Sequence, residues 1–533
     1  MANESNASHD MNGEAKFASE DRRDSTMKKI NLQRIRDHAQ QLKADLLDSM
    51  NTQLEELLDG FVSTVEQIEV GDDADSVQTA NNNSPEPKPP KRKKKGELPD
   101  KVFVTRRSVL TELFEISHIQ TIYHIFVAIL IVFSLNTILY DVLEKGTFSL
   151  NFEMIQWAFG KFPKVMAMWV VMQMSTLLIV YPALYYYATY RKPGNSGMLD
   201  IVWICLVVTY QLAFLFIPLI YLIEHELPPA SSVIITTEQI RLIMKTHAFI
   251  RENTARVMYR KKDDDNDGDD TIPDFSKYLY FLFCPTLVYR DNYPRTQTIS
   301  WRYVVTNFSQ VLACLFYIYY IFERFCVPVF QNFNKDHITP KAFILSMFGC
   351  IMPGTLVLFI GFFAILHSWL NAFAEMLRFG DRLFYKDWWN STTFSNYYRT
   401  WNVVVHDWLY TYIYKDVCKL VGHKYRAGAM ACVFLISAVF HEYILTCTFK
   451  FFYPVLFVMF AGAGFGFIFL TDKGSNRSWN VFMWVALFIG NGMLMCLYSM
   501  EFYARRNCIA SMESLLDFVI PRSWFCVSPT SKL

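Results

Sequence analysis

Long apolar segments, nearly all without a formal charge, recur along this chain and are separated by polar connections. A helix rises about 1.5 Å per residue, so about 20 apolar residues cross the roughly 30 Å hydrocarbon core of a bilayer. Eight segments predict membrane-spanning helices: Ile122–Tyr140, Val165–Tyr187, Ile201–Ile223, Tyr303–Phe322, Ala342–Ala374, Ala427–Phe449, Phe451–Thr471 and Trp479–Met500. The pattern therefore predicts an all-α, polytopic membrane protein.

Three segments complicate this simple series. Ala342–Ala374 is too long for one straight span, and Pro353–Gly354 is expected to kink it. Trp401–Val421 is rich in aromatic residues but amphipathic, which makes it the candidate for a ninth span. One long polar connection, Glu224–Arg302, interrupts the spans.

Two local patterns resemble known binding motifs but favour structural roles. Five residues in the polar connection match the ligand spacing of a calcium-binding EF-hand loop: Asp263, Asp265, Asp267, Gly268 and Asp274. Pro273, and the lack of a clear amphipathic helix after it, favour a solvated acidic turn instead. The run Gly462, Gly464 and Gly466 lies in an apolar span and follows no strand, so it indicates helix packing rather than a nucleotide-binding loop.

The polar segment ahead of the spans divides into three parts. Residues 1–28 are polar and predicted to be disordered. Residues 29–69 predict an amphipathic helix, whose apolar stripe favours self-association; packing on the cytosolic surface of the same chain is the alternative. Residues 70–100 form a Pro-rich linker, and its basic run at 91–95 predicts a cytosolic N-terminus ahead of the membrane domain at 101–533. The stripe comprises Leu47, Met50, Leu54, Leu57, Phe61, Val65 and Ile68.

Composition narrows the possible functions. The net charge is +1, which gives no electrostatic footprint for nucleic-acid binding. The first 25 residues hold no apolar run that could act as a cleaved signal peptide, so internal spans are expected to direct insertion. The 11 cysteines are scattered without a CxxC pair or a Cys/His cluster, so no metal site is predicted.

One ionisable side chain lies deep within a predicted span, which makes it a functional hypothesis. His441 follows the uncharged run Ala427–Phe440, and a neutral imidazole is the form that a general base requires. Ser437 lies one turn earlier on the same face and could hydrogen-bond it. Glu442 points about 100° away, so the two form no dyad within the helix, and there is no HExxH spacing of a zinc hydrolase. The alternative is a structural histidine satisfied by a neighbouring helix.

A second group of polar residues follows the string FYKDWWN. The string holds Phe384, Tyr385, Lys386, Asp387, Trp388, Trp389 and Asn390. If the segment after it is helical, Arg399, Asn402, His406 and Tyr414 share one face. Such a face suits a polyanionic thioester, because it offers positive charge for phosphates and an amide N–H for a carbonyl oxygen. The alternative is a belt of aromatic residues at the membrane interface.

These strings resemble the membrane-bound O-acyltransferase superfamily. The resemblance rests on FYKDWWN at 384–390, on Trp401-Asn402 and on SAVFHEY at 437–443. The flanking residues 367–376 and 406–410 are more similar to the sterol O-acyltransferases than to the diacylglycerol branch. The likeness runs from about Val102 to Cys526. It implies about nine transmembrane helices around a reaction chamber, in the endoplasmic reticulum membrane.

The resemblance also implies roles for individual residues. His441 would be the catalytic base and Asn402 its partner, while His118 would lie near the sterol. The acyl-CoA tunnel would be lined by Asn396, Arg399, Trp401, Asn402, His406, Tyr414, Arg426 and Ser437. Acyl-CoA and a sterol would be the substrates, with no metal or other cofactor. The N-terminal helix of such enzymes, which forms homotetramers, would correspond to residues 29–69.

The expected reaction transfers a long-chain fatty acyl group from acyl-CoA to the 3-hydroxyl of cholesterol or a related sterol. His441 would take the hydroxyl proton, and Asn402 would stabilise the developing oxyanion or hold the thioester. One alternative is the same transfer to diacylglycerol. Another is a non-catalytic sterol-binding or transport protein, but Asn402 has no role there and no paired interrupted spans indicate an inverted repeat.

Deletion of residues 1–69 is predicted to lower the oligomeric state, from tetramer to dimer, while the membrane fold is kept. The reason is the apolar stripe between Leu47 and Ile68, which has no other domain to pack on. Light scattering of the protein in detergent measures this, and an unchanged particle size would contradict it.

Cys508 and Cys526 are predicted to form a disulfide in the short tail after the last span. A tail this small builds little core, and a crosslink would order it if the tail is lumenal, because disulfides persist in that compartment. With a cytosolic N-terminus, a lumenal tail requires an odd number of spans. The alternative, two free cytosolic thiols, is favoured by Arg505 and Arg506 beside the span. Non-reducing mass spectrometry decides, and two alkylatable thiols would refute the bridge.

Overall fold

The computed structural model of this chain describes residues 98–146, 152–191, 197–259, 272–333, 339–422, 425–471, 476–508 and 515–525. Among these residues the only β-structure is two isolated bridges, and the rest of the regular structure is helical, as predicted. The predicted amphipathic helix at 29–69 and the flanking segments 1–28 and 70–97 lie outside the described residues. So do four of the five residues of the acidic turn, since 260–271 are not described.

Seven helical segments in the described part of the chain are long and apolar enough to cross a membrane. They are Ser117–Glu144, Glu153–Tyr190, Gly197–Glu224, Trp301–Phe330, Pro340–Met376, Arg426–Phe449 and Ser478–Asn507. Each contains one of the predicted spans. The remaining predicted span, Phe451–Thr471, forms a shorter helical run, which begins at Val455. The chain is therefore a multi-pass membrane protein by length and composition of its helices.

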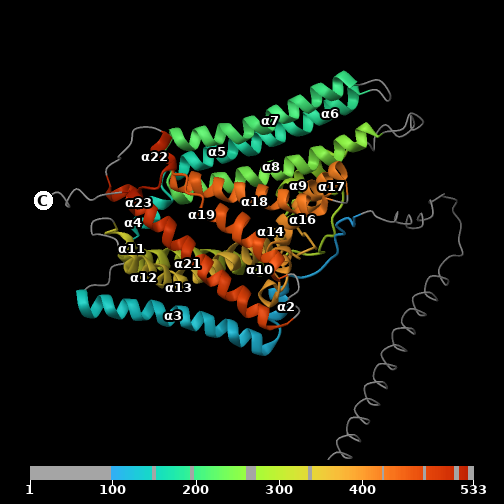
Figure 1. Cartoon of the computed structure of the whole chain (residues 1–533). Coiled ribbons are helices and arrows are strands. Elements are labelled where there is room, and N and C mark those ends of the chain that lie inside the picture. The colour runs from blue at the N-terminus through green and yellow to red at the C-terminus, as the bar shows by residue number, and fades with distance from the viewer. Residues whose placement is uncertain are drawn as a thin grey trace, which may run out of the picture. The chain divides into compact units, whose positions relative to one another are not determined.

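Figure 1 labels most of the α-helices that build these segments. A short α2 (Val109–Leu113) precedes α3 (Ser117–Lys145), α4 (Glu153–Ala158), α5 (Phe162–Ser175), η1 (Thr176–Val180), α6 (Tyr181–Tyr190) and α7 (Gly197–Glu224). The middle of the chain forms α8 (Pro229–Met258), α9 (Phe275–Phe283), α10 (Trp301–Ile321), η2 (Phe322–Cys326) and α11 (Val327–Phe330). The last elements are α18 (Arg426–Phe449), α19 (Val455–Phe457), η7 (Val458–Gly464), α20 (Phe465–Thr471), α21 (Ser478–Asn507), α22 (Leu515–Val519) and α23 (Arg522–Phe525).

The long fifth span is interrupted three residues before Pro353, the residue expected to kink it. Its elements are α12 (Pro340–Gly349), α13 (Ile351–Phe362), η3 (Phe363–Trp369) and α14 (Leu370–Met376), and the break falls at Cys350. Pro353 explains the displacement, because proline has no N–H for the carbonyl four residues earlier, which belongs to Gly349, the last residue of α12. Gly354 serves packing instead: a Cβ there would lie 2.8 Å from the carbonyl oxygen of Asn491 in α21.

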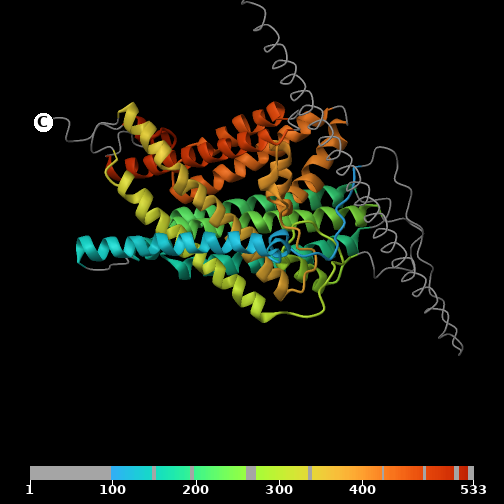
Figure 2. The same cartoon turned by 90° about the horizontal axis from the view of Figure 1, so that it is seen from below.

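The predicted polar connection at Glu224–Arg302 holds none of the candidate spans found in the described part of the chain, but it contains α8, a helix of 30 residues that was not predicted. α8 packs against α5, α7 and α18, and the views in Figures 1 and 2 show it running alongside them. Its buried polar side chains are satisfied inside the bundle: Lys245 Nζ donates to the carbonyl oxygens of Phe281 at 2.5 Å and Cys284 at 2.7 Å. Because so many buried side chains of α8 are polar, hydropathy alone does not predict this helix.

The candidate ninth span, Trp401–Val421, is not one continuous apolar helix. The chain forms η4 (Trp388–Asn390) and α15 (Phe394–Trp401), breaks at Asn402, and continues as α16 (Val403–Trp408), η5 (Leu409–Tyr414) and α17 (Lys415–Val421). This segment is not among the helices apolar enough to cross a membrane. The lumenal position of the C-terminal tail thus stays a prediction. Cys508 is buried after α21 and disulfide-bonded, but Cys526 lies outside the described residues, so their pairing stays a prediction too.

An extended segment, Leu98–Ser108, joins the polar N-terminal part to α2 and is called the strap here. Arg106 anchors it: its guanidinium contacts both carboxylate oxygens of Asp381, at 2.7 and 3.1 Å, and its backbone N–H donates to the Gly380 carbonyl. Asp381 is only 3% exposed. The strap is therefore fixed to the loop between α14 and α15 by a partly buried ion pair.

Asp381→Ala is expected to lower the free energy of unfolding by about 2–3 kcal/mol, because it leaves the Arg106 guanidinium partly buried without its partner. The matched control is Arg107→Ala, which removes an ion pair to Glu115 whose side chains are both 65% exposed and should cost less than about 1 kcal/mol. Thermal unfolding of the purified variants in detergent compares them. Equal shifts of the midpoint would contradict the anchor.

Candidate active site

A cavity of about 920 Å³ lies between the broken segment α15–α16–η5 and the helices α18, α19–η7–α20 and α21. Most of its lining is apolar, with side chains such as Phe434, Met459, Phe460 and Leu487. Its polar lining residues in the described part of the chain include Arg426, which begins α18, and His441, further along the same helix.

Most of the predicted site residues meet in this cavity. The lining includes His441 and seven of the eight residues expected to contact acyl-CoA: Arg399, Trp401, Asn402, His406, Tyr414, Arg426 and Ser437. The eighth, Asn396, does not line it; its Nδ2 donates to Ser391 Oγ at 2.9 Å. His118, expected near the sterol, lies exposed in the first turn of α3 and is not part of the lining.

The ring of His441 is held in one orientation. Its Nδ1 lies 2.7 Å from the backbone carbonyl oxygen of Ser437, and the Ser437 hydroxyl is farther away, at 3.5 Å. A carbonyl only accepts hydrogen bonds, so Nδ1 carries the proton of a neutral imidazole and the lone pair is on Nε2. The ring stacks on Phe460, with centroids 5.6 Å apart. His441 therefore presents a free basic nitrogen in an apolar cavity.

Asn402 lies at the break between α15 and α16, with φ −137° and ψ 89°. The predicted common face of Arg399, Asn402, His406 and Tyr414 assumed a helical segment; the helix is interrupted at this residue, yet all four side chains line the cavity. Its Oδ1 accepts a hydrogen bond from the Val405 N–H at 3.1 Å and so caps α16. Because the oxygen serves as the cap, the amide NH₂ is the group that Asn402 can offer to a ligand in the cavity.

The FYKDWWN string supports this break and does not line the cavity. The Val403 N–H donates to the Phe384 carbonyl at 2.9 Å, and the Lys386 N–H donates to the Thr400 carbonyl at 2.8 Å. These two bonds flank Asn402 and satisfy backbone groups that the interrupted helix leaves without partners. Three aromatic residues of the string, Phe384, Tyr385 and Trp388, are buried in the main core beneath it.

Two arginines supply the positive charge of the cavity. Arg399 and Arg426 are exposed, and neither forms an ion pair with another described residue. Arg426 begins α18 and His441 lies fifteen residues later, so the two are about 22 Å apart along the helix axis. Met430, Phe434 and Ser437 line the cavity between them. One face of α18 thus joins a cationic end to the basic imidazole.

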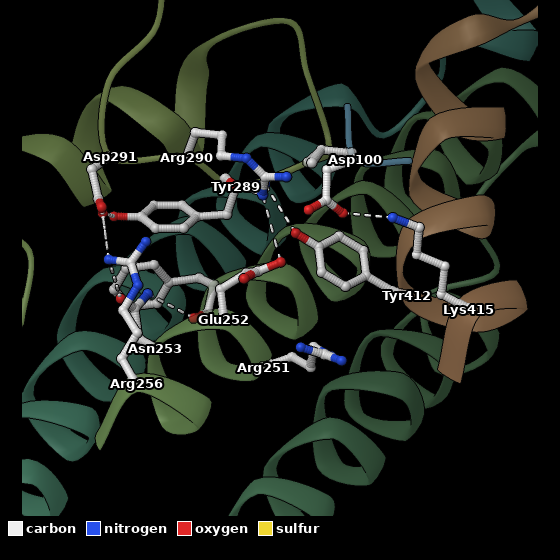
Figure 3. A network of polar contacts seen from close by, with 12 residues as sticks. Asp100, Arg251, Glu252, Asn253, Arg256, Tyr289, Arg290, Asp291, Tyr412 and Lys415 are labelled. Atoms are coloured by element: carbon white, nitrogen blue, oxygen red, sulfur yellow. Dashed lines mark hydrogen bonds and ion pairs between the residues drawn. The ribbon is translucent and has the colours of Figure 1, made fainter. Parts of the chain in front are cut away.

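The cationic end is bordered by the strap and a network of ion pairs. Leu98 lines the cavity, and Asp100 accepts from Lys415 Nζ at 2.5 Å, a hydrogen bond that holds the pKa of Asp100 below its usual value. Lys101 pairs with Asp407, the neighbour of His406, at 2.6 Å. Figure 3 shows how this end continues into contacts between α8 and the loop after α9. They include Arg256 with Asp291, Arg290 with Glu252, and the Tyr289 N–H with Tyr412 Oη.

Sequence reasoning did not single out several lining residues. Asn491 of α21 is a polar residue of the lining, and its Nδ2 donates to the Leu487 carbonyl of its own helix. The sequence signal that could have identified Asn491 is its position as a polar residue inside the apolar span Trp479–Met500.

Of the three glycines interpreted as packing residues, Gly464 confirms that role, since a Cβ there would lie 2.3 Å from Tyr398 Oη. Gly462 and Gly466 have nothing within 4 Å of such an atom.

Comparisons with known proteins place the chain among membrane-bound acyltransferases. The model of the membrane-bound O-acyltransferase family, MBOAT, matches residues 152–500. The chain is 50% identical to Sterol O-acyltransferase 1 of Mus musculus over 429 residues, which is 80% of this chain and 79% of that protein. It is 43% identical to Sterol O-acyltransferase 2 of Homo sapiens over 497 residues, 92% of this chain and 91% of that protein. All lining residues except Leu98 lie within the residues that the family model matches.

Proposed function

The chain belongs to the membrane-bound O-acyltransferase family, and from this premise we propose that it is an acyl-CoA:sterol O-acyltransferase. It transfers a long-chain fatty acyl group from acyl-CoA to the 3-hydroxyl of cholesterol or a related sterol, and releases CoA. The observation that carries this function is His441. Its Nε2 has no hydrogen-bond partner among the described residues, and the other end of its mostly apolar cavity holds Arg399 and Arg426, which form no ion pair with that part of the chain. The sequence likeness to two sterol O-acyltransferases assigns the acceptor.

The proposed chemistry begins with the sterol hydroxyl, which is a poor nucleophile. His441 Nε2 takes its proton while the oxygen attacks the thioester carbonyl carbon, so the new C–O bond forms as the proton leaves. The amide NH₂ of Asn402 donates to the carbonyl oxygen as negative charge develops there. The C–S bond then breaks, and the CoA thiolate takes the proton back from His441. The balance needs no metal or redox cofactor.

Acyl-CoA would bind with its phosphates at the cationic end. Arg399 and Arg426 offer unpaired guanidinium groups, and His406 and Tyr414 add hydrogen-bond donors. The pantetheine arm would then follow α18 toward His441 and bring the thioester to the base. The apolar lining between them supports this role, because it excludes water that would hydrolyse the thioester.

The same proposal includes the membrane in which the enzyme resides, its oligomeric state and its orientation. It would reside in the endoplasmic reticulum membrane as a homo-oligomer, with its N-terminus in the cytosol and its C-terminus in the lumen. The basic run at 91–95 ahead of the first span supports this orientation. CoA would then reach the cavity from the cytosol, and the sterol from the surrounding lipid.

A microsomal assay with labelled oleoyl-CoA tests the function directly. The expected product is a labelled sterol ester when cholesterol is supplied. Labelled triacylglycerol from diacylglycerol, without sterol ester, would instead assign the diacylglycerol branch. No transfer to either acceptor would favour a non-catalytic sterol-binding or transport protein.

His441→Ala is expected to abolish turnover while the fold and CoA binding are kept. Loss of the general base should slow the reaction by about 10²–10⁴-fold or more. The measurement is esterification by the purified variant, with binding of a CoA analogue as the control for folding. Near-normal esterification would end the assignment of His441 as the base.

Asn402→Ala is also expected to be severely impaired in turnover, because it loses the proposed oxyanion donor as well as the cap of α16. Asn390→Ala is its comparison: this residue lies outside the cavity and should act through structure or CoA affinity. Steady-state kinetics of both variants separate kcat from the KM for acyl-CoA. If Asn402→Ala kept full kcat and lost only CoA affinity, its role would be binding.

A further inference from the structure

Glu442 follows the proposed base in sequence but faces away from the cavity. It is 4% exposed and does not contribute to the lining. No described cation pairs with it. Its carboxylate instead accepts hydrogen bonds from the Phe457 N–H at 3.0 Å and from the Tyr498 hydroxyl at 3.0 and 3.1 Å. A buried carboxylate with only neutral donors is costly, so a specific role must account for it.

The donors identify that role. Tyr498 Oη also accepts a hydrogen bond from the Leu456 N–H at 3.2 Å. Leu456 and Phe457 begin the helical run Val455–Thr471, and the first N–H groups of a helix have no partners within it. Glu442 of α18 and Tyr498 of α21 therefore cap this run from two other helices. In an apolar bundle no water replaces them.

The capped run is a wall of the cavity. Its residues Leu456, Met459, Phe460 and Gly464 line it, and the Phe460 ring stacks on the His441 imidazole. Tyr398 of α15 packs directly against Gly464, which leaves no space for the run to move toward α15. The position of the wall against the base thus depends on how its first turn is held.

We propose that Glu442 and Tyr498 are positioning residues for acyl transfer, which fix the wall Val455–Thr471 and through Phe460 the geometry at His441. The inference rests on the proposed function, since it concerns the same reaction. Glu442 acts here only as a hydrogen-bond acceptor. It neither touches substrate nor gives or takes a proton in the reaction.

The test compares purified Tyr498→Phe, Glu442→Gln and Glu442→Leu with the wild type in the sterol esterification assay. Tyr498→Phe removes one hydroxyl and should lower kcat about tenfold, because a small misplacement at a reacting centre is costly. The KM for acyl-CoA should change less than about twofold, since its phosphates bind at the other end of α18. Glu442→Gln keeps an oxygen acceptor for the Phe457 N–H and should stay within about threefold of wild-type kcat. Glu442→Leu should lose more than about tenfold.

Tyr453→Phe is the matched control. Tyr453 belongs to the same aromatic cluster as Tyr498, and its hydroxyl accepts from Trp524 Nε1 at 3.0 Å. Its backbone carbonyl accepts from the Val455 N–H, a bond that Tyr453→Phe keeps, and its hydroxyl caps none of the described helices of the cavity. It loses the same group at the same end of the bundle, so it reports any general effect on stability. Its kcat should equal that of the wild type.

Four results would overturn the proposal. Glu442→Gln as impaired as Glu442→Leu would show that the charge is needed. A Tyr498→Phe variant with normal kcat, or with an effect on KM alone, would show that the cap does not position the base. Equal losses in Tyr453→Phe and Tyr498→Phe would show a stability effect. Faster amide hydrogen exchange at Leu456–Phe460 in Tyr498→Phe is expected, and unchanged exchange would refute the cap. An inactive wild type would refute the proposed function instead.

Discussion

A helix that is interrupted inside an apolar bundle must find partners for every backbone group that the interruption frees, and this protein depends on how it meets that requirement. Pro218 in α7 is the simplest case. Because proline has no N–H, the carbonyl of Phe214, four residues earlier, has no helical donor. Gln239 of α8 supplies one from its Nε2 at 2.9 Å, and its Oε1 accepts from Tyr443 of α18 at 2.7 Å. One amide thereby repairs α7 and joins three helices, including the one that carries His441.

The cavity lies between two further interruptions of the same kind. At Asn402 the chain breaks between α15 and α16, and at Val455 a helix begins within the bundle. Irregular backbone is tolerated in such a bundle where it is buried in protein or lines a cavity. The side chain of Asn402 meets the requirement at the first break, and Glu442 and Tyr498 meet it at the second. The fixed polar groups near the proposed reaction centre are thus the partners of interrupted helices.

The sequence predicted those features that are determined by the side chains within a single segment. Apolar length identified the spans, and an ionisable residue within an apolar run identified His441. The sequence could not predict α8, because the polar side chains of that helix donate hydrogen bonds to carbonyl oxygens of residues such as Phe214 and Phe281, which lie far away in sequence. The break at Asn402 was missed because helical spacing alone gave Arg399 and His406 a common face, and the bonds that hold the break come from Phe384 and Lys386.

Most of the site residues that the family resemblance predicted line the cavity, and the two departures have a structural cause. Asn396 follows the N-cap Thr393 in the first turn of α15, where its amide is used by Ser391. His118 lies on α3, which is largely exposed and is joined to the bundle through contacts such as the ion pair of Asp141 with Arg324. A motif fixes the type of residue at a position, but not the direction in which that side chain points. The seven residues that do line the cavity lie on α18 or on the interrupted segment α15–α16–η5, the two elements between which the cavity lies.

The distance between Arg426 and the basic His441 along α18 has a physical reason, because the apolar bundle between them solvates charge poorly. A polyphosphate is too costly to bury among side chains such as Phe434 and Met430, so under the proposed function it would stay with Arg399 and Arg426. Only the uncharged part of the acyl donor would pass the apolar stretch and reach His441. The about 22 Å between Arg426 and His441 would then select the donor by the length of its arm as well as by its charge. A free fatty acid has neither the phosphates nor the arm, so this geometry would discriminate against it.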